Sequence, residues 1–296
     1  MEHMSNRGVP GGREAEGTGE EVARLREEVR NLRAQVRSRP LISHAQGILQ
    51  ERYRLPDADS AFALLRQSSQ RFNVKLRLLA EAVVRTQRPD GPRELWFPGR
   101  VRRKPPVLDA LGVDDPGHVN RGAVLSAVLS QSLAITGTDM GNVQITDRAA
   151  RGLRIEHHTG LSEHFVEFFA FVGEDGTSCA KAARDVALTT VHDVATDEVF
   201  TDEARHTILA AGSRACHSVP LVGASGECLG MVSVHLERPT KALHPAQAKA
   251  LAATGRQVGR WLAWHDHTVV VDALEYLHAQ GRSGDAGTDT GTRTDS

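Results

Sequence analysis

The 296-residue sequence contains few cysteines and no long hydrophobic run. Its three cysteines, Cys179, Cys216 and Cys228, are odd in number and form no C-x-x-C pair, so they predict no disulfide framework. We therefore expect a reducing compartment, the cytoplasm. No run of about 18 apolar residues predicts a membrane-spanning helix. The N-terminal residues also lack the apolar segment of a signal peptide.

The sequence also lacks the short motifs that mark common catalytic sites. It has no phosphate-binding loop and no G-x-S-x-G nucleophile elbow. No pair of carboxylates indicates general acid–base chemistry. Cys216 and His217 are neighbours on an expected strand, so their side chains point to opposite faces and are poorly placed to share a metal ion. We expect no catalytic residues, no metal site and no bound cofactor, and we do not expect an enzyme.

The net charge of −1 conceals an asymmetry along the chain. Residues 40–104 contain 13 Lys and Arg against 6 Asp and Glu, whereas residues 119–296 contain 15 against 21. The first region suits a polyanion such as a nucleic acid, and the second does not. A basic face that is simply solvated is the alternative.

Composition and periodicity divide the chain into six segments and predict a multidomain protein of α and α+β class. We expect disorder over 1–19, a coiled coil over 20–38, a three-helix module over 39–86, a Pro- and Arg-rich linker over 87–118, a mixed α+β domain over 119–266, and a short helix with a disordered tail over 267–296. Trp96 and Phe97 in the linker are expected to dock elsewhere on the protein.

The coiled coil is predicted by apolar residues that alternate at spacings of three and four. β-branched residues take the a positions and leucines the d positions, a pattern that favours a parallel two-stranded coil. The coil is expected to make the protein a homodimer. An amphipathic helix packed on its own domain is the alternative. The expected dimer contacts are Val22, Leu25, Val29, Leu32 and Val36.

The helical module, residues 39–86, is expected to begin with a helix over about 40–53. Asp57 is a candidate N-cap for the second helix, and Asn73 for the third. Gly47 lies inside the first helix, where glycine costs about 1 kcal/mol relative to alanine. We therefore expect a neighbouring helix or a ligand to approach closely at Gly47.

The mixed domain, residues 119–266, shows alternating strand patterns near both of its ends. A G-A-S-G turn at 223–226 predicts a hairpin. Residues 163–172 and 245–265 read as helices, and residues 189–194 as a strand. The pattern predicts one central antiparallel sheet with helices packed on it.

Residues 41–84 contain the motifs Ala45-x-Gly47, Ala61-Phe62-x-Leu64-Leu65 and Asn73-x-Lys75-Leu76. With these motifs the segment resembles an ANTAR domain, the output module of transcription antitermination regulators. The resemblance implies a three-helix module that binds paired RNA stem-loops as a dimer and prevents transcription termination. The coil before the module is also usual in that family.

The predicted RNA-binding residues are the basic side chains of the module, which suit phosphates, and the residues of its motifs. Gln46 stands where the family usually has lysine, which keeps open an alternative in which the module docks a protein. No DNA and no membrane partner are expected. The predicted set is Ala45, Gln46, Gly47, Arg52, Arg66, Arg71, Asn73, Lys75 and Arg77.

The mixed domain resembles a GAF domain through Gly176-Thr177-Ser178-Cys179-Ala180, the strand 191–194 followed by Ala195-Thr196-Asp197, and Ser218-Val219-Pro220-Leu221. The resemblance implies a domain that senses a small molecule or a partner in signal transduction, or one that serves in dimerisation. Ordinary core packing is the alternative for its candidate ligand pocket. The candidate pocket residues are Phe168, Phe171, Cys179, His192, Val194, Cys216 and Met231.

Overall fold

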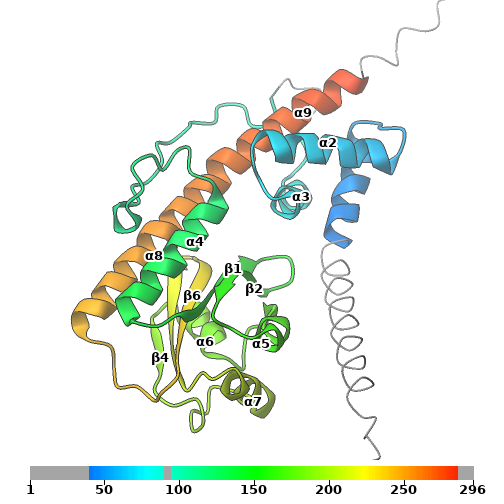
Figure 1. Ribbon diagram of the computed structural model, residues 1–296. Helices are drawn as coiled ribbons and strands as arrows, with labels where there is room; N and C mark the ends of the chain where they lie inside the picture. Colours follow the sequence, from blue (N-terminus) through cyan, green and yellow to red (C-terminus); the bar gives the residue numbers. More distant parts are fainter. Residues whose placement is uncertain (1–39, 90–94, 286–296) are drawn as a thin grey trace, which may run out of the picture.

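The computed structural model describes residues 40–89 and 95–285. Within these residues the helical module lies beside the mixed domain, and one long helical element connects them (Figure 1). The disorder expected over 1–19, the coiled coil expected over 20–38, and residues 286–296 of the expected tail lie outside the described residues.

A six-stranded antiparallel sheet forms the centre of the mixed domain, as its strand patterns predicted. The strand order is β3-β2-β1-β6-β5-β4. The two strands of the G-A-S-G hairpin, Ala215–Val222 and Cys228–Leu236, are buried over most of their length, because helices cover both faces of the sheet. The strands are β1 Met140–Asp147, β2 Gly152–Thr159, β3 Phe171–Val172, β4 Thr189–Val191, β5 Ala215–Val222 and β6 Cys228–Leu236.

Two long helices, α4 (Arg121–Thr136) and α8 (Pro245–His265), pack on one face of the sheet. A Cβ atom at Gly259 of α8 would lie 2.2 Å from the carbonyl oxygen of Val222, so glycine lets the helix rest directly on β5. The other face carries the short helices α5 (Glu163–Phe168), α6 (Ser178–Asp185) and α7 (Asp202–Ala210). Each face encloses its own hydrophobic cluster.

The helix expected over residues 163–172 is shorter than predicted. Helix α5 ends at Phe168, and Phe171–Val172 form the edge strand β3. Leu153 of β2 is the strand partner of Val172. The apolar residues of this segment fit a helix face, but pairing with β2 takes up the backbone groups of its last two residues. The expected strand 189–194 likewise ends at Val191.

The helical module contains the three expected helices: residues 40–52, α2 (Ala58–Arg71) and α3 (Leu76–Arg85). Asp57 is confirmed as the N-cap of α2, because its carboxylate accepts a hydrogen bond from the Ser60 amide at 2.7 Å. This bond to the Ser60 backbone lowers the pKa of Asp57. A charged cap also interacts favourably with the helix dipole.

A fourth helix, α9 (Val271–Asp285), completes the core of the helical module. It continues α8 through a π-helical segment, η2 (Asp266–Val270), and crosses from the mixed domain to the module (Figure 1). Ala273, Leu274 and Leu277 are at most 1% exposed there. The expected helix after residue 267 is therefore present, but it is a core element of the module and not part of a tail.

Polar contacts fix the position of α9. The hydroxyl of Ser68 in α2 donates a hydrogen bond to the carbonyl oxygen of Ala273 at 2.6 Å. The hydroxyl of Tyr53 lies 2.9 Å from Nδ1 of His278. A Cβ atom at Gly281 would lie 2.7 Å from the Tyr53 ring, so the helix and the ring are in close contact. These buried contacts require one register of α9 against the module.

The linker docks on α9 through its aromatic and basic residues. Trp96 is buried and stacks on Phe97. Both residues pack against the core of the helical module, so the expectation that they dock elsewhere on the protein is confirmed. The backbone amides of both residues donate to the Glu275 carboxylate, at 2.9 and 2.7 Å. Arg100 and Arg102 pair with Asp272. Two acidic residues of α9 thus hold the linker against the module.

We predict that a chain ending at Val270 loses the fold of the helical module and keeps the mixed domain. Each buried leucine that is removed costs about 2–5 kcal/mol, and a core of this size has little stability to lose. Hydrogen exchange should show loss of protection over residues 45–85 and unchanged protection in β5 and β6. A chain ending at Asp285 is the control and should protect both. Full protection of the module in the shorter chain would contradict the role of α9.

Candidate nucleic-acid interface and sensor core

The structure separates the nine predicted RNA-binding residues into different surroundings. Ala45 is buried in the core of the helical module. The Gln46 side chain donates a hydrogen bond to the carbonyl oxygen of Ala58 at 2.9 Å, so it ties the first helix to α2. Arg66 is exposed on α2. Gly47 lines a groove, and the remaining members stack on aromatic rings, shape a helix end or face the mixed domain.

Gly47 is exposed, and no described heavy atom lies within 4 Å of the Cβ position that another residue would have there. The expectation of a close approach by a neighbouring helix is therefore wrong. Gly47 instead lines an open groove of about 510 Å³ between the first helix and α3. His44, Arg52 and Arg88 line the same groove and give it basic groups, beside one acidic residue, Glu51. The backbone at Gly47 is left accessible to a ligand.

Two predicted arginines stack on aromatic rings. The guanidinium carbon of Arg52 lies 4.5 Å from the ring centre of Trp96. That of Arg71 lies 4.9 Å from the ring centre of Tyr276 on α9. Such contacts between a cation and an aromatic face are attractive, by about 0.5–1 kcal/mol at exposed sites. Arg52 and Arg71 therefore contribute to the docking of the linker and of α9.

Asn73 shapes the end of α2 and does not cap α3, so its prediction as an N-cap is wrong. Its φ angle of 50° is left-handed. The Asn73 amide donates to the Gln70 carbonyl, and the Val74 amide donates to the Ser69 carbonyl at 3.0 Å. This pair of bonds is a Schellman motif, in which glycine is preferred and asparagine is accepted at the left-handed position. The N-cap position of α3 is Lys75, without a side-chain bond.

The left-handed backbone at Asn73 predicts a difference between two substitutions. Asn73→Gly should be nearly neutral, whereas Asn73→Val should destabilise the helical module by about 1–2 kcal/mol, because this conformation accepts glycine and asparagine but disfavours a β-branched side chain. The exchange rates of the α2 and α3 amides measure the local free energy of unfolding. Equal stability of the two variants would show that the φ angle of this residue is unimportant.

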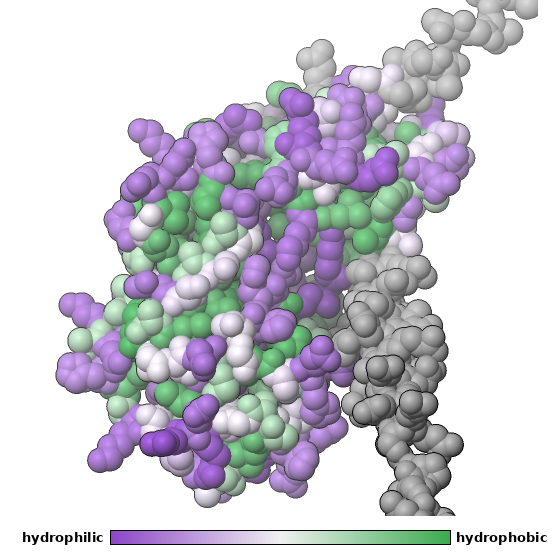
Figure 2. All heavy atoms as spheres, in the orientation of Figure 1, coloured by the Kyte–Doolittle hydropathy of each residue, from purple (hydrophilic) through white to green (hydrophobic). Residues whose placement is uncertain are grey.

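Lys75 and Arg77 face the mixed domain and pair with its acidic residues. Lys75 forms an ion pair with Glu156 of β2. Arg77 donates to the carboxylate of Asp147 at 2.5 Å, and Arg154 donates to the same oxygen at 2.5 Å. The side chain of Asp147 is only 3% exposed. Figure 2 shows hydrophilic residues along this boundary between the helical module and the mixed domain.

The Asp147 carboxylate is a pH-dependent part of this contact. Burial acts to raise its pKa, but hydrogen bonds from Arg154 and the Ala150 amide, with the charges of Arg77 and Arg154, lower it overall. A lowered pKa means that the charged contact stabilises the structure fully above the ordinary value of 3.8. The contribution is lost as the pH falls through the lower folded value. At neutral pH the ion pair is complete.

The seven candidate pocket residues of the mixed domain mostly belong to its core. Val194, Cys216 and Met231 are buried among aromatic and aliphatic side chains, and Phe168 and Cys179 pack against them. The other two lie elsewhere. The ring of Phe171 lies under the Arg154 guanidinium, 5.9 Å from its central carbon. His192 is exposed, with Nδ1 3.1 Å from the Thr240 carbonyl oxygen.

The three cysteines are poorly suited to nucleophilic chemistry. Burial raises the pKa of all three thiols, and that of Cys216 to about 12. At neutral pH they are protonated, and the thiolate is the reactive form. The nearest polar neighbours of Cys179 are the hydroxyls of Ser233 and Ser218. In the described part of the chain no three metal-binding side chains come together.

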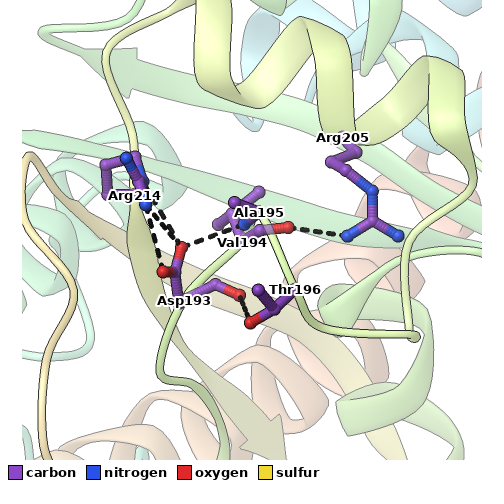
Figure 3. A network of polar contacts seen from close by, with 6 residues as sticks. All are labelled: Asp193, Val194, Ala195, Thr196, Arg205 and Arg214. Carbon is purple, nitrogen blue, oxygen red and sulfur yellow. Dashed lines mark hydrogen bonds and ion pairs between the residues drawn. The ribbon is translucent and has the colours of Figure 1, made fainter.

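An arginine network holds the loop after β4, which carries the Ala195-Thr196-Asp197 motif (Figure 3). One amine of Arg214 lies 3.0 Å from each carboxylate oxygen of Asp193. Arg205 of α7 donates to the carbonyl oxygens of Val194 and Asp197, both at 2.8 Å. These bonds satisfy backbone carbonyls of an irregular segment. The motif therefore has a structural role at the edge of the core.

Two histidines on the central strands are buried. Nδ1 of His217 lies 2.9 Å from the Thr190 hydroxyl, and Nδ1 of His235 lies 3.0 Å from the Ser213 hydroxyl. Burial lowers the pKa of each imidazole to about 4. Both histidines are therefore neutral at physiological pH.

Histidine burial predicts that the mixed domain loses stability between pH 6.5 and pH 4. In this range the unfolded chain binds more protons than the folded chain, so the free energy of unfolding falls on acidification, by roughly 3 kcal/mol at most for each histidine. Urea unfolding at several pH values measures the slope. His235→Asn should reduce it, and His206→Gln on the exposed side of α7 is the control. An equal slope in the first variant and the wild type would contradict this assignment.

Two family models match the sequence. Residues 30–84 match the ANTAR domain, and residues 120–261 match the GAF domain. The chain therefore contains an ANTAR domain followed by a GAF domain, as its motifs predicted. These domains define a regulator of the transcription-antitermination and signal-transduction class. A comparison with curated proteins gave no match.

Several solved structures resemble the mixed domain. The GAF domain/HD domain protein of Geobacter sulfurreducens is 16% identical, with a TM-score of 0.43, over 50% of this chain and 96% of that chain. The GAF domain of an Acinetobacter phosphoenolpyruvate-protein phosphotransferase is 13% identical, with a TM-score of 0.42, over 53% and 93%. Free methionine-R-sulfoxide reductase from Neisseria meningitidis is 16% identical, with a TM-score of 0.41, over 53% and 84%. Similarity at this level carries no argument about activity.

None of the helices in the described residues has the length and apolar character needed to cross a membrane. The acidic residues that contact the module were missed at the level of sequence. Asp147 and Glu156 lie on expected strands, where a carboxylate normally faces solvent. No local signal marks them, because their partners Arg77 and Lys75 lie 70 and 81 positions away in the chain.

Proposed function

We propose that this protein is a dimeric transcription antitermination regulator that binds paired RNA stem-loops through its helical module, and that the mixed domain senses a small molecule or a partner. The ANTAR match and the excess of basic residues over 40–104 support the RNA-binding part. Dimerisation is proposed through the coil over 20–38. No enzymatic step is proposed, which is consistent with the protonated thiols of the mixed domain.

The groove over Gly47 and the exposed face of α2 form the proposed RNA surface. The groove has an accessible backbone at Gly47 and basic side chains around it, which suits a phosphate backbone. Arg66 adds an exposed guanidinium on α2. Arginine can pair with phosphates in a bidentate geometry or stack on an unpaired base.

The observation that carries the regulatory part is the pairing of Lys75 and Arg77 with acidic residues of the mixed domain. Glu156 and Asp147 occupy these cations as phosphates would. RNA must therefore compete with the mixed domain for both residues. The described arrangement corresponds to a form with low RNA affinity, and separation of the two bodies would raise that affinity.

The continuous element α8–η2–α9 supplies the mechanical connection for this control. It rests on β5 at one end and completes the core of the helical module at the other. A change in the mixed domain that shifts α8 would move α9 and the module with it. The order of domains, with the output module first in the chain, is therefore compatible with signalling.

A second candidate function is a regulator whose helical module docks protein. The observation in its favour is that the module already binds a protein helix, α9, through its apolar face and through Arg71. In this case the basic groove would bind an acidic partner surface. The experiment below distinguishes the two functions.

We predict that the double variant Asp147→Asn, Glu156→Gln binds paired stem-loop RNA about tenfold or more tightly than the wild type, because it removes the two carboxylates that pair with Lys75 and Arg77. Fluorescence anisotropy at several salt concentrations measures the affinity, and rising salt should weaken binding steeply. Adding Arg66→Ala to the double variant should weaken binding and reduce the salt slope by about 1.

The matched control is Asp202→Asn, Glu203→Gln on α7, which makes the same change in charge far from the module. It should leave the RNA affinity unchanged. Circular dichroism checks that the fold of each variant is intact. If the double variant Asp147→Asn, Glu156→Gln does not bind RNA at low salt, and a protein partner is recovered on the helical module, RNA binding is rejected and the second candidate is supported.

A further inference from the structure

A small cavity of about 240 Å³ lies where the helical module meets the mixed domain. Helix α3 forms one wall, and strands β1 and β6 form another. The helical element that joins α8 to α9 closes the third side, including the π-helical segment η2. We call this space the junction cavity. It is separate from the core of the mixed domain, where the candidate ligand pocket was expected.

The floor of the junction cavity is apolar. Leu229, Leu262, Val270 and Leu274 line it, and all four are buried. A space of this size is below the range of about 300–1,000 Å³ that is usual for drug-sized ligands. The occupant must therefore be small and must present an aliphatic group to the floor.

Charged groups of both signs surround this apolar floor. Arg121 and Arg148 belong to the mixed domain, Glu81 belongs to α3, and Asp266 begins η2. The side chain of Arg121 is 11% exposed, and its closest carboxylate is Glu156 at 4.0 Å. Glu81 is 3.6 Å from Arg85 within α3. These separations are long for ion pairs with direct hydrogen bonds.

Two of these groups hold buried atoms whose hydrogen-bonding capacity is unused within the described residues. They are Nε of Arg121 and Oδ1 of Asp266. A buried polar atom without a partner costs about 1–3 kcal/mol, more for a charged group. Burial and the nearby carboxylates of Asp147 and Asp266 also raise the pKa of Glu81, against the opposing charges of Arg85 and Arg148. A cation placed between Glu81 and Asp266 would relieve this repulsion.

We propose that the junction cavity binds a small α-amino acid with an aliphatic side chain. The carboxylate would pair with Arg121 and Arg148, and the ammonium group would pair with Glu81 and Asp266. The aliphatic side chain would lie on the floor of leucines and valine. A zwitterion satisfies both signs of charge at once, whereas a simple anion or cation leaves one set without a partner.

The position of the site gives it a regulatory consequence, which rests on the proposed function. Glu81 lies on the helical module, whereas Arg121 and Arg148 lie on the mixed domain, so a bound amino acid would bridge the two. A ligand that contacts both bodies favours the form in which they are docked. In that form Lys75 and Arg77 are paired with acidic residues. The amino acid would therefore lower the RNA affinity. π-Helical segments such as η2 often mark functional positions.

Calorimetric titration of the full chain with L-leucine tests the site itself. 4-Methylpentanoate lacks only the ammonium group and isopentylamine lacks only the carboxylate, and each should bind at least about tenfold more weakly, as expected for the loss of a charge-assisted hydrogen bond. Asp266→Asn should weaken L-leucine binding by a similar factor. Ala82→Leu, which adds bulk to the α3 wall, should abolish binding while the fold is retained. Asp202→Asn on α7 is the control and should bind normally.

Three results would overturn the site: no binding of L-leucine by the wild type, equal binding of all three probes, or unchanged binding in Ala82→Leu. RNA affinity with and without L-leucine then tests the coupling, with a decrease expected. Binding of L-leucine without any RNA binding would reject the proposed function and keep the site. RNA binding that L-leucine leaves unchanged would reject the regulatory consequence.

Discussion

The burial of α9 in the helical module is the interaction on which the rest of the structure depends. Leu274 and Leu277 fill the space between the first helix, α2 and α3, so a helix from the far end of the chain completes a core that three short helices leave unfinished. The same helix continues from α8, which is packed on the sheet. One apolar contact therefore supplies stability to the module and also joins it to the mixed domain.

Electrostatics then determines how the two bodies face each other. The basic excess of the module and the acidic excess of the C-terminal region attract, and the attraction is realised in a few defined pairs. Asp147 is the central one, because a nearly buried carboxylate receives two guanidinium groups. Residues that would serve a phosphate backbone are thereby held by carboxylates. In the proposed function, regulation and recognition use the same side chains, since both depend on the positive charge of Lys75 and Arg77.

Much of the fold and less of the site could be predicted from the sequence. Local chemistry identified the cap at Asp57 and the hairpin around 223–226, because both depend on neighbours in the chain. Asn73 was placed at the correct turn but in the wrong role, since an N-cap and a left-handed C-terminal residue have similar sequence signals. Gly47 inside a helix predicts the close approach of a neighbouring helix or a ligand, and no described helix approaches it. Which residues face one another across the chain was beyond such patterns.

The sequence by itself determined the two domains, their classes and the opposite charges of the two regions, because periodicity, turn residues and composition are local properties. Only the tertiary structure decided that residues 271–285 belong to the helical module, that Lys75 and Arg77 pair with Glu156 and Asp147, and that a cavity forms at the junction. These features join residues that are about 70 to 230 positions apart. Their formation depends on how the apolar surface of α9 is buried, and no short stretch of sequence specifies which surface buries it.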